Sequence, residues 1–279
     1  MPLWRNALRL AVGTLSVVRV TPPTTIDRHV AGRAMLLAPV VAMLPGLAAA
    51  AVVLSGAAVG LPGLLTGVLA VGALALASRG LHLDGLADTA DGLAASYDRE
   101  RALTVMRTGD VGPAGVATLL VVMVAQAAAI GALATGWRGA IAVLMAVVTS
   151  RAVLPMCCAT TVPSARPTGL GATVAGSVPT AAAAAVALAT VAAGALLLLA
   201  LGQEWWRGAL AVVVGFVVAA VLLRRCVRRL GGITGDVLGG CVEVALTAAL
   251  VVLAATPDHP PPFTHLSHKV SKFGPQKRT

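Results

Sequence analysis

Long apolar runs alternate with short polar segments along this chain, and the lengths of the runs predict its architecture. A helix needs about 20 residues to cross a bilayer, and seven runs come close to that length. They lie at about residues 34–56, 57–77, 113–135, 139–160, 179–201, 208–223 and 237–255. No charged residue separates the first two runs, so we expect them to form a tight helical hairpin. The pattern predicts an all-α, polytopic membrane protein with about seven transmembrane helices.

The polar segments divide the chain further. Residues 1–33 carry five arginines and the Pro22-Pro23 break, so we expect an interfacial or cytoplasmic segment that does not span the membrane. Residues 34–256 form the membrane-embedded domain, whose largest polar insert is 79–112. Residues 257–279, with their proline run and four basic residues, are expected to be disordered. We expect no cleavable signal peptide, because arginines interrupt the short N-terminal apolar stretch.

Composition supports a bundle of closely packed helices. Hydrophobic residues make up 58% of the 279 residues, charged residues 11% and aromatic residues 3%, with a mean hydropathy of +0.90. Small residues dominate the apolar part and allow helices to approach closely within a bilayer. The net charge of +10 is explained by basic residues on the cytoplasmic side rather than by nucleic acid. If the N-terminus lies inside, most lysines and arginines face the cytoplasm. The four cysteines lack metal-ligand spacing, so we expect them to be reduced and structural.

The polar insert opens with three carboxylates at helical spacing. Asp84, Asp88 and Asp91 stand at i, i+4 and i+7 in Leu81–Leu93, so a helix places all three on one face. Like charges stacked in this way repel one another, and a divalent cation relieves the repulsion. Hard oxygen ligands suit Mg²⁺, or Mn²⁺. We therefore predict that these three aspartates bind the metal and take part in catalysis, although a solvated helix face would show the same spacing.

The histidine before the first aspartate has two interpretations. His82 can act as a general base near neutral pH, or it can be a residue at the start of the helix that bonds to the backbone. We include it among the candidate catalytic residues.

Arginines and glycine-rich turns supply candidate anion ligands. The predicted substrate-binding residues are Arg107, Arg151, Arg166, Thr234, Gly235 and Asp236. Guanidinium groups donate paired hydrogen bonds to phosphate, and the run 224–229 adds four more arginines whose simpler explanation is membrane topology. Asp236 can instead cap the last helix, and Glu243 lies on the same face of that helix. The insert, the Arg166 loop and the Asp236 loop all emerge on one side in the predicted topology, so they can build one site.

Four motifs resemble one enzyme family. The run His82-Leu83-Asp84-Gly85-Leu86-Ala87-Asp88-Thr89-Ala90-Asp91-Gly92-Leu93 resembles the signature of cobalamin synthase, the adenosylcobinamide-GDP ribazoletransferase family. The segments 106–112, 165–171 and 231–239 are similar to further blocks of that family in the same order. The resemblance covers roughly residues 5 to 255. One block departs from the family: many members have Asp-Ser-Arg after its basic residue, where this chain has Thr108, Gly109 and Asp110.

The resemblance implies a Mg²⁺-dependent transferase of a phosphorus-containing group. Such an enzyme joins adenosylcobinamide-GDP to α-ribazole, or to α-ribazole 5′-phosphate, and releases GMP in the last step of cobalamin (vitamin B12) biosynthesis. The product is adenosylcobalamin or its 5′-phosphate. The predicted topology adds that this is a multi-pass protein of the cell inner membrane with its active site on the cytoplasmic side. The expected partners are the two substrates and the lipid bilayer, with no nucleic acid and with a homo-oligomer left open.

Two other functions compete with this interpretation. The run Asp88-Thr89-Ala90-Asp91-Gly92-Leu93-Ala94-Ala95 resembles the opening of the CDP-alcohol phosphotransferase motif, but Ser96 replaces the arginine of that motif and the later paired aspartates are absent. A transporter with a cation site would instead require paired repeats and carboxylates at mid-membrane. Neither of these features is visible in the sequence.

Overall fold

The structure of the protein, a computed structural model, describes residues 2–95 and 97–255. The predicted tail 257–279 therefore lies outside the described residues. Helices account for all the regular elements in these two ranges, apart from isolated bridges at Ala159–Val178 and Ser164–Ile233. The helices are α1 (Pro2–Leu15), α2 (Arg28–Leu36), α3 (Ala38–Val41), α4 (Met43–Ala58), α5 (Gly63–Ala77), α6 (Leu81–Ala95), α7 (Arg99–Val105), α8 (Pro113–Leu133), α9 (Trp137–Ala152), α10 (Leu154–Cys157), α11 (Leu170–Val174), α12 (Thr180–Ala200), α13 (Trp205–Leu230) and α14 (Gly235–Ala254). The all-α prediction is confirmed.

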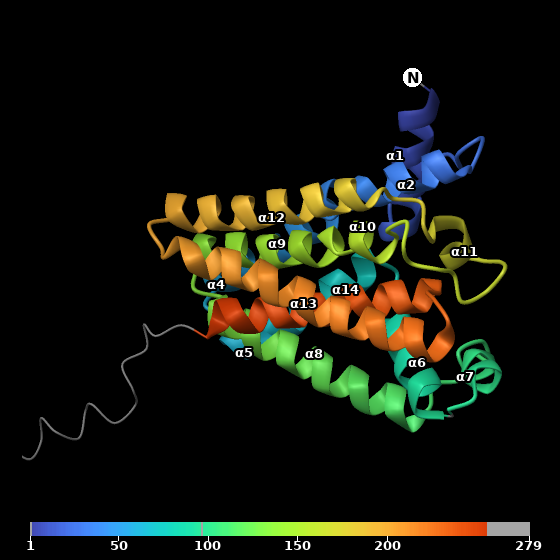
Figure 1. The fold of residues 1–279 in the computed structure, drawn as a ribbon. Helices are drawn as coiled ribbons and strands as arrows, with labels where there is room; N and C mark the ends of the chain where they lie inside the picture. The colour runs from blue at the N-terminus through green and yellow to red at the C-terminus, as the bar shows by residue number, and fades with distance from the viewer. Residues whose placement is uncertain (1, 96, 256–279) are drawn as a thin grey trace, which may run out of the picture.

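Six helices in the described chain are long and apolar enough to cross a membrane. They are Ala38–Ala58, Pro113–Leu133, Trp137–Cys157, Thr180–Ala200, Trp205–Leu230 and Gly235–Ala254. A seventh candidate is the pair α5 and α6, which passes the same test together but bends by 92° between the two helices. We assign the crossing to α5, which packs along α4 and α8, and place α6 outside it, across the end of the bundle (Figure 1). The protein is therefore a multi-pass membrane protein.

The first predicted span is interrupted where the sequence showed only an apolar run. Asp27 caps α2, since its Oδ1 accepts a hydrogen bond of 2.8 Å from the Val30 amide. The helix then breaks before α3 and again before α4, close to Pro39 and Pro45. Proline has no amide hydrogen and clashes with the preceding turn, so the regular helical hydrogen bonding is interrupted at such positions. The expected hairpin of the first two spans is confirmed, because α4 and α5 pack against each other.

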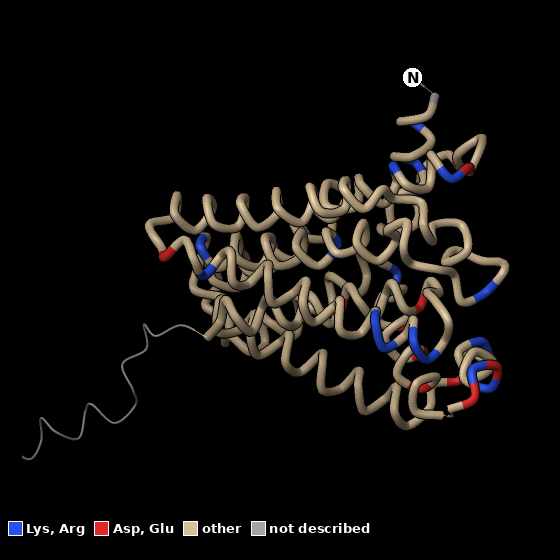
Figure 2. Tube along the Cα trace, viewed as in Figure 1, with Lys and Arg blue, Asp and Glu red and all other residues tan. Residues whose placement is uncertain are grey.

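Charged residues gather at one end of the bundle. Figure 2 shows that most of the blue and red positions lie at the end that carries α6, α7 and α11, while few lie at the opposite end. The chain returns to the charged end between α9 and α12, and again between α13 and α14 (Figure 1). The interior is filled mainly by alanine, valine and leucine, together with the four cysteines, which are free and buried. One end of the bundle is therefore polar enough to hold a site.

Candidate active site

Three segments that are distant in sequence meet at the charged end. At Gly85 of α6, a Cβ atom would lie 2.7 Å from the carbonyl oxygen of Asp236, so only glycine lets α6 approach the start of α14 this closely. The loop after α10 pairs with the turn before α14 through backbone bonds from Ala165 to Ile233 (2.9 Å) and from Ile233 to Pro163 (2.9 Å). The prediction that the insert, the Arg166 loop and the Asp236 loop share one end of the bundle is confirmed.

The first turn of α14 presents a carboxylate to this junction. Thr234 is the N-cap, and its Oγ1 accepts a 3.2 Å hydrogen bond from the Val237 amide and donates one of 3.1 Å to Asp236 Oδ2. The alternative that Asp236 itself caps the helix is therefore wrong. A short hydroxyl two residues earlier, in extended backbone, reaches the free amide first. The Asp236 carboxylate is left to face the Arg166 loop.

Arg166 stands between the acidic end of α14 and α7. Its Nη1 lies 3.8 Å from Asp236 Oδ2, and its Nη2 donates a 2.8 Å hydrogen bond to the Leu103 carbonyl. A cavity of about 220 Å³ opens beside it, lined by Leu81, Arg166, Thr168, Gly169, Leu170, Gly171, Ala172, Ile233, Thr234, Gly235 and Asp236. A second cavity of about 210 Å³ shares Arg166 and adds Arg99 and Arg107. The structure thus brings five of the six predicted substrate-binding residues to two neighbouring cavities.

The aspartates of α6 differ in their surroundings. Asp84 is exposed and Asp88 is half-buried. Partial burial raises the pKa of Asp88 to about 6, and repulsion from Asp84, Asp236 and Asp91 adds to the shift, while the Arg166 charge lowers it. These carboxylates therefore interact electrostatically across the α6–α14 junction. A cation placed among them would stabilise their ionised forms.

Asp91 already has partners in the protein. Its Oδ2 accepts a 2.7 Å hydrogen bond from the Gly112 amide and its Oδ1 accepts one of 2.8 Å from the Gly115 amide. The side chain is 6% exposed and so caps the start of α8, whose first amides have no partner within the helix. Among the residues described, no group of three or more His, Cys, Asp or Glu side chains is placed to hold a metal ion. The three-aspartate metal set stays a prediction.

His82 and Arg151 lie beneath the site in the interior. His82 is 3% exposed and Arg151 is 1% exposed. Arg151 Nη2 lies 3.2 Å from His82 Nδ1, and Arg151 Nη1 donates a 2.7 Å hydrogen bond to Ser150 Oγ. Burial, with the Arg151 charge second, holds the pKa of His82 well below its usual value, so the imidazole is neutral and accepts through Nδ1. Neither residue lines the cavities beside Arg166.

The arginines of the run 224–229 and Glu243 lie away from the two cavities beside Arg166. Arg229 stacks 4.2 Å from the ring centroid of Tyr97, and Arg224 and Arg228 line a different groove. Glu243 is buried and accepts a 2.8 Å hydrogen bond from Gln126 Nε2, as expected for a structural glutamate.

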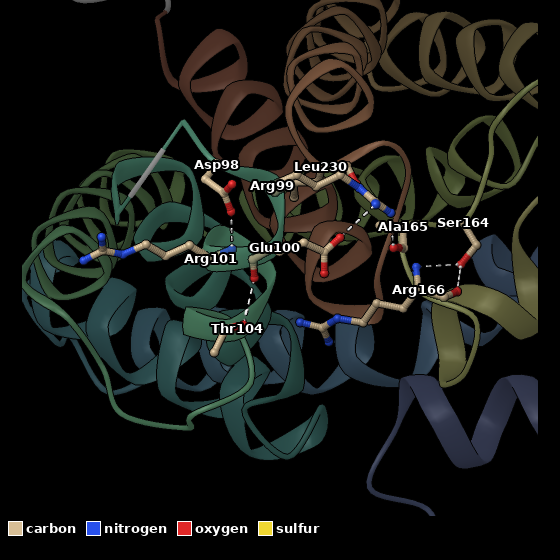
Figure 3. Close-up of polar contacts among 9 residues, drawn as sticks. All are labelled: Asp98, Arg99, Glu100, Arg101, Thr104, Ser164, Ala165, Arg166 and Leu230. Carbon is tan, nitrogen blue, oxygen red and sulfur yellow. Dashed lines mark hydrogen bonds and ion pairs between the residues drawn. The ribbon is translucent and has the colours of Figure 1, made fainter.

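Arg99 was not singled out by the sequence, yet it joins the three segments. Its Nε donates to the Leu230 carbonyl and its Nη2 to the Ala165 carbonyl, each at 2.8 Å. Figure 3 shows its guanidinium between the carbonyl groups of Leu230 and Ala165 and beside Glu100. The only signal in the sequence is a basic residue directly after Asp98, the N-cap of α7.

Comparison with known proteins identifies the family. The sequence profile of the family described as cobalamin-5-phosphate synthase matches residues 7–254. The chain belongs to this family. It is 51% identical over 253 residues to an adenosylcobinamide-GDP ribazoletransferase of Nocardioides sp., which covers 90% of this chain and 99% of the relative. It is 42% identical to one of Frankia casuarinae, with 89% and 94% covered, and 34% identical to one of Bradyrhizobium diazoefficiens, with 89% and 93% covered.

No solved structure matches the chain. Family membership decides between the two transferase families suggested by the aspartate motif, in favour of cobalamin synthesis. The protein is a transferase of that pathway, and the residues converging at the charged end are the candidates for its chemistry.

Proposed function

We propose that the chain joins adenosylcobinamide-GDP to α-ribazole, or to α-ribazole 5′-phosphate, and releases GMP. A hydroxyl oxygen of the ribazole forms a new bond to the phosphorus that carries the cobinamide. The anhydride bond to the GMP phosphate breaks, and the hydroxyl proton passes to a base or to water. The observation that carries the proposal is the meeting of Arg166 with the carboxylates of α6 and α14 beside a glycine-lined cavity.

Arg166 is the residue best placed to hold the diphosphate. Its guanidinium is fixed by Leu103 on one side, and the cavities on either side of it are lined by Thr234, Gly235, Arg99 and Arg107. A bound diphosphate would compete with Asp236 for the Arg166 guanidinium. This exchange is feasible because Arg166 Nη1 and Asp236 Oδ2 are 3.8 Å apart, which is a loose contact. Arg107 is exposed and lines the second cavity, so its side chain can bind the other phosphate of the diphosphate.

We further propose that Mg²⁺ is the metal, with Mn²⁺ as a substitute, held by Asp84 and Asp88. The donor set fits, because Mg²⁺ is commonly bound by one or two carboxylates together with substrate phosphates rather than by a complete protein cage. When bound, the metal would neutralise the anhydride oxygens and the departing GMP. Asp91 and His82 would orient α6 from below through their bonds to α8 and Arg151.

The site is proposed to face the cytoplasm in the cell inner membrane, because basic residues gather at that end of the bundle. A single cysteine introduced by Thr168→Cys, in the loop beside the cavity, should react with a membrane-impermeant maleimide in inside-out vesicles and not in right-side-out vesicles. The reverse labelling would place the site outside.

The assay uses the full chain in lipid nanodiscs with adenosylcobinamide-GDP and α-ribazole. GMP release is expected with Mg²⁺, to be lost with EDTA and to return with excess Mg²⁺. Substituting α-ribazole 5′-phosphate identifies the preferred acceptor. Absence of GMP release with both acceptors and both metals would refute the proposal, and turnover of a CDP-linked alcohol instead would favour the other transferase family.

A further inference from the structure

A further cavity, away from the candidate active site, forms a groove between α12 and α13. Its volume is about 760 Å³, and its wall is formed by Met156, Ala159, Thr161, Val162, Thr180, Ala183, Ala184, Ala187, Ala220, Leu223, Arg224, Val227 and Arg228. The two helices run side by side (Figure 1). They approach closely at the opposite end of the bundle, where a Cβ atom on Gly194 would lie 3.0 Å from the carbonyl oxygen of Gly208. Alanines keep the space open at the charged end.

The groove lies on the surface that the bilayer covers. Large apolar side chains within one helical turn of the groove residues in sequence are exposed. They are Leu188 of α12 (71%) and Val217 and Val221 of α13 (54% and 61%). Large apolar side chains exposed on a membrane-spanning helix face lipid tails. The groove is therefore open to lipid rather than to water along most of its length.

The two arginines stand at the depth of the lipid headgroups. α13 has 26 residues, or about 39 Å at about 1.5 Å per residue, and so exceeds a hydrocarbon core of about 30 Å. Trp205 at its first turn is 55% exposed and suits one interface. Arg224 and Arg228 then fall at and just beyond the other interface.

The groove carries two positive charges, from Arg224 and Arg228. Arg224 and Arg228 are four residues apart, so they share one helix face, and both are exposed. No Asp or Glu is found among the described residues that line the groove. The neighbouring Arg229 points elsewhere and stacks on Tyr97. An apolar floor below a pair of cations fits an amphiphile with an anionic head.

We propose that this groove binds an anionic phospholipid, with its phosphate on Arg224 and Arg228 and one acyl chain over Ala184 and Ala187. Basic pockets between transmembrane helices bind anionic lipid headgroups in this way. The alanine floor supplies room for the chain, and Thr161, an exposed residue of the groove wall, supplies a hydroxyl for the headgroup. A second copy of the protein would also cover the apolar surface, but it would leave the arginine pair without an anion.

Native mass spectrometry of the purified full chain tests the proposal. The protein in neutral detergent is titrated with dioleoyl phosphatidylglycerol or dioleoyl phosphatidylcholine, and the lipid-bound masses are counted. One phosphatidylglycerol is expected to bind with preference over phosphatidylcholine. The double substitution Arg224→Gln with Arg228→Gln should weaken this binding about 25-fold, since each cation contributes about a factor of five.

Two further variants separate the groove from general surface charge. Arg225→Gln removes an equal charge one residue away, on a different helix face, and should leave phosphatidylglycerol binding unchanged. Ala187→Phe fills the floor with both arginines intact and should reduce binding, while inorganic phosphate should not compete. Equal binding of both lipids, equal loss in Arg225→Gln, or a dimer mass that disappears with Ala187→Phe would overturn the proposal. Because the readout is lipid mass and not turnover, it is independent of the proposed reaction.

Discussion

Arg151 Nη2 lies 3.2 Å from His82 Nδ1 in the interior of the bundle, and this contact joins the membrane helix α9 to the helix that carries the aspartates. Both side chains are almost completely buried. A guanidinium in such surroundings needs hydrogen-bond acceptors, and Ser150 and His82 provide two. We interpret the pair as the support that fixes the start of α6 against the bundle.

The Arg151 and His82 side chains should make coupled contributions to the free energy of unfolding. Arg151→Leu or His82→Leu alone leaves a buried polar partner unsatisfied, at a cost of about 1–3 kcal/mol in the free energy of unfolding. The double variant should cost less than the sum of the two single variants, because both polar groups leave together. Denaturant titration in mixed micelles measures this coupling. Strict additivity of the two losses would show that the contact does not contribute.

Asp84 and Asp88 should matter for turnover and not for folding. Asp84→Asn and Asp88→Asn are each expected to lower kcat by about 10³-fold through lost electrostatic stabilisation. The Tm should be unchanged or slightly higher, because repulsion with Asp236 and the other aspartates is relieved. Asp110→Asn is the matched control, since Asp110 is an exposed acid in the same insert. Wild-type turnover in the Asp84 and Asp88 variants would contradict the assignment.

Asp91 should behave differently from the other two aspartates. Asp91→Asn exchanges one accepting oxygen for an amide that faces the amides of Gly112 and Gly115. The lost cap should lower the free energy of unfolding by about 1–2 kcal/mol. Thermal unfolding tests this by comparing the Tm of Asp91→Asn with the Tm of Asp88→Asn. An unchanged Tm in Asp91→Asn, with loss of activity alone, would instead favour a direct role at the metal.

Arg166 should determine the affinity for the nucleotide substrate. Arg166→Ala is expected to raise the KM for adenosylcobinamide-GDP about 10- to 100-fold, as for the loss of a hydrogen bond to a charged group. Arg166→Lys should recover little, because an ammonium group cannot contact Leu103, Asp236 and a phosphate together. Steady-state kinetics checks this prediction. The control is Arg101→Ala, because Arg101 is an exposed arginine of α7. A fall in kcat with an unchanged KM would place Arg166 in the chemical step instead.

The sequence by itself determined the membrane class, the approximate positions of the spanning helices and the end of the bundle where the candidate site residues gather. Hydropathy and run length depend on local composition, and the bilayer imposes one length on every crossing. The aspartate spacing of α6 and the glycines around Asp236 were also readable, because helical periodicity fixes which side chains share a face.

Only the tertiary structure decided what each polar side chain contacts. The sequence placed Asp91 with Asp84 and Asp88, yet the start of α8 occupies both of its oxygens. It grouped Arg151 with the phosphate ligands, whereas packing buries that residue against His82, and it gave no reason to single out Arg99, whose partners lie 66 and 131 residues further along the chain. Partners so far apart are brought together by helix packing, which local sequence patterns do not specify.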